Sequence, residues 1–202
     1  MGPRGTLRPI FDFELTRALF GLQMMEGVVT VNAKEWIVEG TVWKVGDNVN
    51  TESITPSRWL HEGPNDIMEH IGEILIPDFP KRMKKGDIWA GGSNLGCSSS
   101  RNAPLYLKNK GIGVIVCHSA SRIFYRNALN SGLPIFEVGK EVEKIGTGDR
   151  VRVNVKTGEI KNLTTGAEIR AKGLPEFIMA ILESGGINPY ILSRKSEYKL
   201  LK

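Results

Sequence analysis

The segment Gly91-Gly92-Ser93-Asn94-Leu95-Gly96-Cys97-Ser98-Ser99-Ser100-Arg101 has almost no side-chain bulk and separates two strongly patterned stretches. Residues 88–90 before it are predicted to form a strand. After it, Pro104 suits the first turn of a helix, with Asn102 as a candidate N-cap and Gly111 as a C-terminal stop. A strand, a glycine-rich turn and a helix in this order are typical of a parallel α/β unit.

The same alternation continues on both sides of this unit. Residues 113–117 form a short apolar run bounded by glycine and polar residues, as in a buried parallel strand. Ser119 is a candidate cap for a helix that reaches Asn130, and residues 133–138 are predicted to form the next strand. Upstream, residues 40–45 are predicted as a strand, followed by a loop over 53–60 and a short helix from Pro64 to about residue 71. Right-handed crossovers and a parallel sheet follow from this order.

The pattern changes after residue 141. Residues 149–155 alternate between apolar and polar side chains, and residues 156–159 have the pattern of a turn. Residues 160–164 then run back as the second strand. This predicts a β-hairpin on a half-exposed antiparallel sheet. Pro175 then begins an apolar-faced helix that ends at Gly185. The predicted fold class is therefore α/β, a parallel sheet with helices beside a smaller antiparallel sheet.

The chain is expected to contain one main domain. We place that domain at residues 40–192, with an N-terminal extension over 1–39 and a basic C-terminal tail over 193–202. Met24 and Met25 are alternative start sites, which would make the first two dozen residues an artefact of the gene model. An additional packing arm for a partner is the other interpretation of this extension.

Composition and charge limit the class of protein. The chain has 202 residues, of which 41% are hydrophobic and 24% charged, as in ordinary globular proteins. It contains no apolar run of the roughly 20 residues that cross a bilayer. The N-terminus carries Asp12 and Glu14 and has no apolar core of a signal peptide, so we expect a cytoplasmic protein with no membrane partner.

The net charge of +5 is mild and its basic residues are scattered. A nucleic-acid surface usually concentrates basic residues with aromatic ones, so nucleic acid is an unlikely partner. An anionic small substrate or an acidic partner face explains the excess equally well. Two cysteines and three scattered histidines cannot hold an iron–sulfur cluster or a structural zinc alone. We therefore assign no metal ligand to this chain, and any metal must belong mostly to another chain.

The segment from Ser98 to Arg101 carries the strongest chemical pattern. It lies between a predicted strand end and a helix start, where backbone N–H groups and the helix dipole favour negative charge. Arg101 is suited to bidentate binding of a carboxylate. A serine here could accept a proton from carbon only if its alkoxide were stabilised. An ordinary Gly/Ser-rich turn is the alternative interpretation, and the GxxxxGK[ST] pattern of an NTPase is absent.

A series of motifs follows in a specific order along the chain. These are Gly86-Asp87-Ile88, Ala90-Gly91-Gly92, Leu95-Gly96-Cys97, Ser99-Ser100-Arg101, Ala103-Pro104, Arg122-Ile123-Phe124-Tyr125-Arg126-Asn127-Ala128, Gly132-Leu133-Pro134 and Thr157-Gly158-Glu159-Ile160. The series resembles the archaeal-type small subunit of isopropylmalate isomerase and homoaconitase, which corresponds to the swivelling domain of aconitase. The resemblance covers roughly residues 40–191.

The resemblance implies a fold, a reaction and separate roles for a small and a large subunit. The fold is a swivelling three-layer β/β/α domain, and the reaction is reversible dehydration of a hydroxy di- or tricarboxylic acid. Ser99 matches the family's catalytic base, while Ser100 and Arg101 match its substrate-carboxylate binders. The family's large subunit carries a [4Fe–4S] cluster, which implies a heterodimer or heterotetramer in which this chain alone binds no cluster.

The sequence departs from the family at three places near the loop. Ser98 replaces a glycine, in a turn that favours positive φ. Asn102 stands where the family has Glu-His, so one residue is missing before the helix. The upstream Asp-Thr-Asp pattern appears as Asn50-Thr51-Glu52.

A fourth departure concerns substrate choice. The family's specificity loop corresponds here to Trp59, Leu60, His61 and Glu62, without the arginine or apolar pair of better-known members. His61 contacts a polar substituent of the substrate or is a solvated loop residue, and Arg58 binds substrate or is a surface arginine. Other interpretations therefore stay open. The chain is a homoaconitase-like or dimethylmalate-type dehydratase subunit, or it is a non-catalytic structural partner of the large subunit.

Two further arginines, Arg122 and Arg126, lie four residues apart on a predicted helix. They suit either a partner interface or a salt-bridged face, and the sequence does not decide between these.

Overall fold

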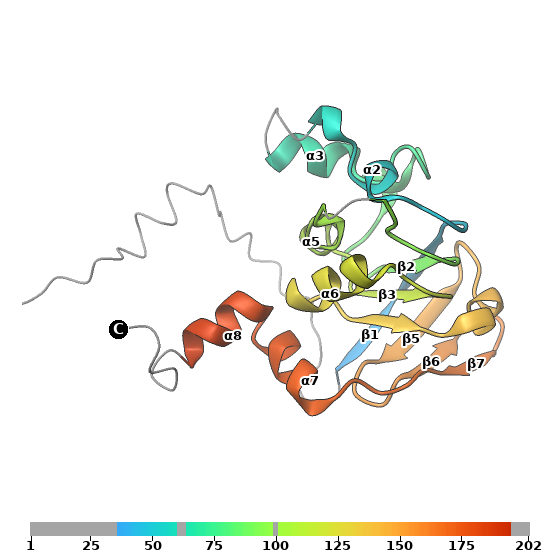
Figure 1. The fold of residues 1–202 in the computed structure, drawn as a ribbon. Helices are drawn as coiled ribbons and strands as arrows, with labels where there is room; N and C mark the ends of the chain where they lie inside the picture. Colours follow the sequence, from blue (N-terminus) through green and yellow to red (C-terminus); the bar gives the residue numbers. More distant parts are fainter. Residues whose placement is uncertain (1–35, 60–63, 99–100, 195–202) are drawn as a thin grey trace, which may run out of the picture.

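A computed structural model describes residues 36–59, 64–98 and 101–194 (Figure 1). Seven strands form one sheet in the order β4-β3-β2-β1-β5-β6-β7. The parallel strands are β1 (Ile37–Lys44), β2 (Ile88–Gly91), β3 (Val114–Cys117) and β4 (Ile135–Glu137). The antiparallel strands are β5 (Arg150–Asn154), β6 (Glu159–Asn162) and β7 (Glu168–Arg170).

Strand β1 joins the two predicted sheets into one. Its first residues pair antiparallel with β5, from Ile37 opposite Asn154 onward, and its last residues pair parallel with β2, from Val42 opposite Ile88 onward. β1 begins three residues before the predicted start, and this extra length provides the pairing with β5. The predicted α/β class is confirmed, and its parallel and antiparallel parts are continuous through β1.

The two halves of the sheet differ in burial as their sequences predict. All residues of β2 and β3 are buried, as in a sheet covered on both faces. The hairpin strands β5 and β6 alternate between exposed and buried residues, so one of their faces is exposed. In Figure 1, β5–β7 lie on the side of the molecule away from α2 and α3.

The helices agree with the sequence where their patterns are long and differ where they are short. The described elements are α2 (Thr51–Ile54), η1 (Ser57–Trp59), α3 (Pro64–His70), α4 (Phe79–Arg82), α5 (Ala103–Lys110), α6 (Arg122–Asn130), η2 (Gly139–Lys144), α7 (Glu176–Glu183) and α8 (Ile187–Ser193). The predicted helices from Pro64, before Gly111 and after Pro175 are confirmed. Helix α6 begins at Arg122, three residues after the predicted cap Ser119, because Ser121 caps it by accepting the Phe124 N–H at 3.3 Å.

Helix α6 is central to the helical side of the molecule. It contacts α5, α7 and α8, and its apolar residues Phe124, Ala128 and Leu129 face the core. Trp89 of β2 and Phe79 of α4 pack edge to face in the core, with ring centroids 4.9 Å apart. In the described part of the chain, no helix is long and apolar enough to cross a membrane.

Asp87 fixes the start of β2 against β1. Its buried carboxylate accepts hydrogen bonds from the Thr41 N–H at 3.0 Å, the Trp43 indole N–H at 2.8 Å and the Lys84 N–H at 2.8 Å. A buried carboxylate is tolerated only when such donors replace its water shell. Because β2 leads directly into the glycine-rich loop, Asp87 sets the register from which that loop departs.

We predict that Asp87→Ala lowers the free energy of unfolding by about 3 kcal/mol or more, because it leaves buried N–H donors without acceptors. Urea denaturation of the isolated chain measures this effect. The matched control is Asp78→Ala, since the Asp78 carboxylate is 68% exposed and its ion pair with Arg82 is long, at 3.6 Å. The control should change stability by less than about 1 kcal/mol. Equal losses in the two variants would contradict the structural role of Asp87.

Candidate functional site

The loop over residues 92–98 lies directly against the segment that follows β1. The Gly96 N–H donates to the Val49 carbonyl at 2.7 Å, and the Thr51 N–H donates to the Cys97 carbonyl at 3.3 Å. Asn50 and Cys97 form a parallel β-bridge. These contacts place the chain that leaves β1 beside the chain that leaves β2.

The other side of the loop contacts the start of α6. The Ser121 N–H donates to the Leu95 carbonyl at 2.8 Å, and the Ser121 hydroxyl donates to the Gly96 carbonyl at 2.7 Å. Gly96 has φ +73°, and a Cβ at this position would lie 2.1 Å from the Phe124 ring of α6. Only glycine fits here, because any side chain would collide with that ring. The loop is therefore held between the β1 exit and α6.

Ser98 occupies the left-handed region of backbone conformation, with φ +73°. The sequence predicted a turn that favours positive φ at this position, and the structure confirms it. Serine is less suited to this conformation than the family's glycine, because its Cβ approaches the following backbone. Its side chain is exposed at the edge of the loop.

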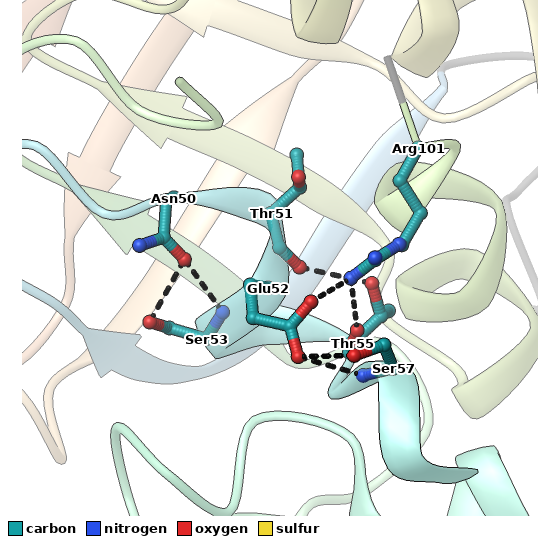
Figure 2. A network of polar contacts seen from close by, with 7 residues as sticks. All are labelled: Asn50, Thr51, Glu52, Ser53, Thr55, Ser57 and Arg101. Atoms are coloured by element: carbon teal, nitrogen blue, oxygen red, sulfur yellow. Dashed lines mark hydrogen bonds and ion pairs between the residues drawn. The ribbon is translucent and has the colours of Figure 1, made fainter. Parts of the chain in front are cut away.

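Arg101 leaves the loop on the side of helix α2 (Figure 2). Its guanidinium donates to the Glu52 carboxylate and, at 2.9 Å, to the Thr55 carbonyl. Glu52 in turn accepts the Ser57 N–H and hydroxyl, each at 2.8 Å. Asn50 caps α2 by accepting the Ser53 N–H at 2.7 Å, so the helix that presents Glu52 has a fixed start.

These donors change the ionisation of Glu52. Hydrogen bonds from the Ser57 backbone, then the Arg101 guanidinium and then the Ser57 hydroxyl lower the pKa of the Glu52 carboxyl from its usual 4.5 to about 2. The shift extends the range in which Glu52 is an anion from about pH 4.5 down to about pH 2. Arg101, held by the Glu52 carboxylate, therefore lies next to the glycine-rich loop that the sequence predicts to favour an anion.

The predicted substrate residue Arg58 has a different local partner. Its guanidinium donates to Glu73 at 2.7 Å, and the Trp59 indole N–H donates to the same carboxylate oxygen at 3.2 Å. His70 stacks on Trp59, with ring centroids 3.7 Å apart, and its Nδ1 lies 2.6 Å from the other Glu73 oxygen. Glu73 thus fixes the start of the expected specificity loop. Hydrogen bonds from His70, Arg58 and Trp59 outweigh desolvation, the largest single effect, and lower the pKa of Glu73.

The predicted site residues that the structure describes fall into two groups. Arg101 and the Asn50-Thr51-Glu52 segment are brought together, while Arg58 and Trp59 form the separate cluster around Glu73. The remaining predicted residues lie outside the described residues: Ser99, Ser100, Leu60, His61 and Glu62. Asn102 precedes α5 as predicted, but its side chain makes no cap hydrogen bond; its amide oxygen Oδ1 instead accepts the Ser131 hydroxyl at 3.2 Å.

Sequence reasoning did not assign roles to Glu52 and Glu73. Glu52 was visible only as a departure from the family's Asp-Thr-Asp pattern, yet its carboxylate is the partner of Arg101. Glu73 gave no motif signal, because its three partners are placed by the fold rather than by one continuous segment.

Neither cysteine belongs to a cluster of metal-binding side chains in the described part of the chain. Burial raises the pKa of the Cys117 thiol to about 12, and Glu137 adds to this effect, so Cys117 is a poor thiolate ligand. The Cys97 thiol contacts the Asn48 carbonyl at 3.4 Å. Across the residues that the structure describes, no group of three or more histidine, cysteine or acidic side chains could hold a metal ion.

The fold and the loop define an aconitase-type domain. Residues 57–139 match the family model of the aconitase C-terminal domain. The chain is 49% identical over 163 residues to an isopropylmalate/citramalate isomerase small subunit of Methanocaldococcus jannaschii, covering 80% of this chain and 97% of the relative. It is 42% identical over 162 residues to a 3-isopropylmalate dehydratase small subunit of Heliobacterium modesticaldum, covering 79% and 98%.

A solved structure supports the same assignment. A crystal structure of a 3-isopropylmalate dehydratase from Methanocaldococcus jannaschii aligns with a TM-score of 0.74 and 33% identity, over 80% of this chain and 96% of that chain. The chain belongs to the family of 3-isopropylmalate dehydratase small subunits. The resemblance seen in the sequence and the predicted class, the small subunit of a hydro-lyase, are thereby confirmed.

We predict that the Glu52 carboxyl titrates near pH 2 in the isolated chain, measured by carbon-13 NMR of its side-chain carboxyl. The lowered pKa means that its ion pair contributes stability above pH 4.5 and loses that contribution as the pH falls through about 2. Arg101→Met should move the pKa upward, toward 4.5, while Arg170→Met, whose arginine pairs with Glu159, should not. An unchanged Glu52 pKa in Arg101→Met would contradict the ion pair.

The backbone of Ser98 gives a second prediction. Ser98→Val should be about 1–2 kcal/mol less stable than Ser98→Gly in urea denaturation, because a β-branched residue is strained at positive φ. Equal stability of the two variants would mean that residue 98 does not hold this conformation in solution.

Proposed function

We propose that this chain supplies the catalytic base and a carboxylate-binding arginine for a hydro-lyase of the 3-isopropylmalate dehydratase class, which acts on a hydroxy di- or tricarboxylic acid. The observation that carries the proposal is the position of Arg101 at the end of a loop held between the β1 exit and α6. Relatives at 49% and 42% identity are named as small subunits of such enzymes.

In this proposal Ser99 removes a proton from the carbon next to a substrate carboxylate. A serine can do so only as a stabilised alkoxide, and the N-terminus of α5 and a guanidinium supply positive charge on that side of the loop. Ser100 and Arg101 hold the substrate carboxylate, since arginine presents a planar pair of donors to a carboxylate. Glu52 and the Thr55 carbonyl orient Arg101 before the substrate arrives.

The cofactor in this proposal is a [4Fe–4S] cluster carried by the large subunit. When bound, the cluster would supply Lewis-acid chemistry for the departure of the substrate hydroxyl. The residues of this chain suit a role opposite the cluster rather than as its ligands, because Cys117 is a buried thiol with a raised pKa. A heterodimer or heterotetramer with that large subunit follows, and its stoichiometry stays a prediction.

The substrate is proposed at the level of its class. One relative is named for isopropylmalate and citramalate, and others for 3-isopropylmalate. A homoaconitase-like or dimethylmalate-type reaction is the alternative, because the Trp59–Glu62 loop lacks the family's usual residues. In the proposal His61 and Arg58 contact the variable substituent of the substrate, and Glu73 sets the position from which Trp59 enters this loop. A cytoplasmic location and a lack of nucleic-acid binding also stay predictions.

Replacing the proposed base tests this function. Ser99→Ala, assembled with the cluster-loaded large subunit, should lower turnover by at least about a thousandfold, because alanine has no side-chain oxygen to take the proton. Ultraviolet absorbance of the unsaturated product measures turnover. Ser184→Ala is the control, since this hydroxyl donates to the Ala180 carbonyl of α7 at 2.9 Å and lies outside the loop. Near-normal turnover by Ser99→Ala would refute the base assignment.

A further inference from the structure

Helix α6 presents two arginines beside the proposed catalytic loop. Arg122 and Arg126 lie one helical turn apart, both are exposed, and Ile123 between them is 51% exposed. Among the residues that the structure describes, no carboxylate forms an ion pair with either arginine. The neighbouring Glu137 carboxylate instead accepts the Ala120 N–H at 2.7 Å.

These side chains line a hollow of about 760 Å³ that reaches the loop. Its lining residues are Asn94, Ser98, Ala120, Ser121, Arg122, Ile123 and Arg126. None of them is acidic, and the N-terminus of the nine-residue helix α6 adds positive potential at the same place. The hollow therefore offers a cationic surface around one exposed aliphatic side chain.

Hydrogen bonds and packing connect the hollow to the loop. Ser121, the cap of α6, bonds the backbone of Leu95 and Gly96, and the Gly96 backbone lies against the Phe124 ring. A contact that fixes α6 consequently acts on the loop backbone at Leu95 and Gly96. A protein surface that binds here would set the distance between that loop and whatever lies opposite it.

We propose that this hollow docks an acidic segment of the large subunit, with carboxylates against Arg122 and Arg126 and an apolar side chain against Ile123. The inference rests on the proposed function, since a loop that works opposite a cluster in another chain must have that chain next to its rim. Charge complementarity selects an acidic occupant, because the surface has two arginines without described acidic partners. Docking through α6 then positions the loop as the complex forms.

The test measures assembly separately from turnover. Binding of the isolated small subunit to its cognate, cluster-loaded large subunit is followed anaerobically by calorimetry and size-exclusion chromatography. The charge-reversed variant R122E/R126E should bind at least about tenfold more weakly, and its binding should lose most of the salt dependence of the wild type. Circular dichroism and thermal melting establish that the variant is folded, and the milder R122Q/R126Q variant should give a smaller loss in the same direction.

The matched control changes charge by the same amount elsewhere. Lys156 and Lys172 are exposed; Lys156 lies in the turn between β5 and β6, Lys172 follows β7, and neither lines the hollow. K156E/K172E should bind the large subunit as the wild type does, so a loss in both double variants would mean that only net charge matters and would overturn the proposal.

Other outcomes identify other roles for the arginines. Normal binding by R122E/R126E with a raised KM for the hydroxy acid would show that they contact substrate, and a loss of self-association alone would indicate a second copy of this chain. Normal binding with normal kinetics would leave them without the proposed role. Each of these results refutes the docking proposal. If the wild-type complex assembles through these arginines yet turns over no hydroxy acid, docking stands and the proposed reaction fails.

Discussion

The hydrogen bonds between the loop and its two neighbours are the constraint on which this site depends. The loop over residues 92–98 uses its backbone to contact both the chain that leaves β1 and the start of α6. Such contacts require residues without bulk, and Gly96 shows why, since any side chain there would collide with Phe124. The small-residue composition is therefore a packing requirement as much as a chemical one. It allows three segments that are distant in sequence to meet at the carboxyl ends of the parallel strands.

The Arg101–Glu52 pair follows from this arrangement. β1 and β2 are parallel neighbours, so the segments after both strands emerge at the same edge of the sheet. One segment provides Glu52 on the short helix α2, and the other provides Arg101. The Glu52 carboxylate and the Thr55 carbonyl both accept hydrogen bonds from Arg101, so the arginine has a defined orientation before any ligand binds. In our proposal this orientation lowers the entropy cost of substrate binding, because the Arg101 side chain is already ordered when the substrate carboxylate reaches it.

The sequence predicts features that depend on local pattern. The buried run in β3, the alternation in β5 and the glycine after α5 each specify an element within a few residues. The sequence predicts a loop over 53–60 and no helix at Thr51–Ile54, because α2 has only four residues and its cap Asn50 lies in a segment dominated by polar residues. The double pairing of β1 could not be predicted, because pairing depends on strands more than 40 residues away.

The candidate site shows the same contrast between local signals and long-range contacts. Arg101 was predicted from its position between a strand and a helix, a local signal. Its partner Glu52 is 49 residues away in the sequence and becomes its neighbour only through the parallel pairing of β1 and β2. The cluster around Glu73 is similar, since Arg58 lies 15 residues from the carboxylate that binds it. The roles of Ser99, Ser100 and His61 rest on the family resemblance and stay predictions.

The most direct measurement of the central claim is turnover by the anaerobically reconstituted complex against isopropylmalate, citramalate, dimethylmalate, homocitrate and citrate. Absorbance of the unsaturated product would be compared for the complex, the cluster-loaded large subunit alone and this chain alone. Our account predicts that one acid is clearly preferred and that only the complex turns it over. Equal turnover by the large subunit alone, or no turnover of any acid by a cluster-loaded complex, would contradict it.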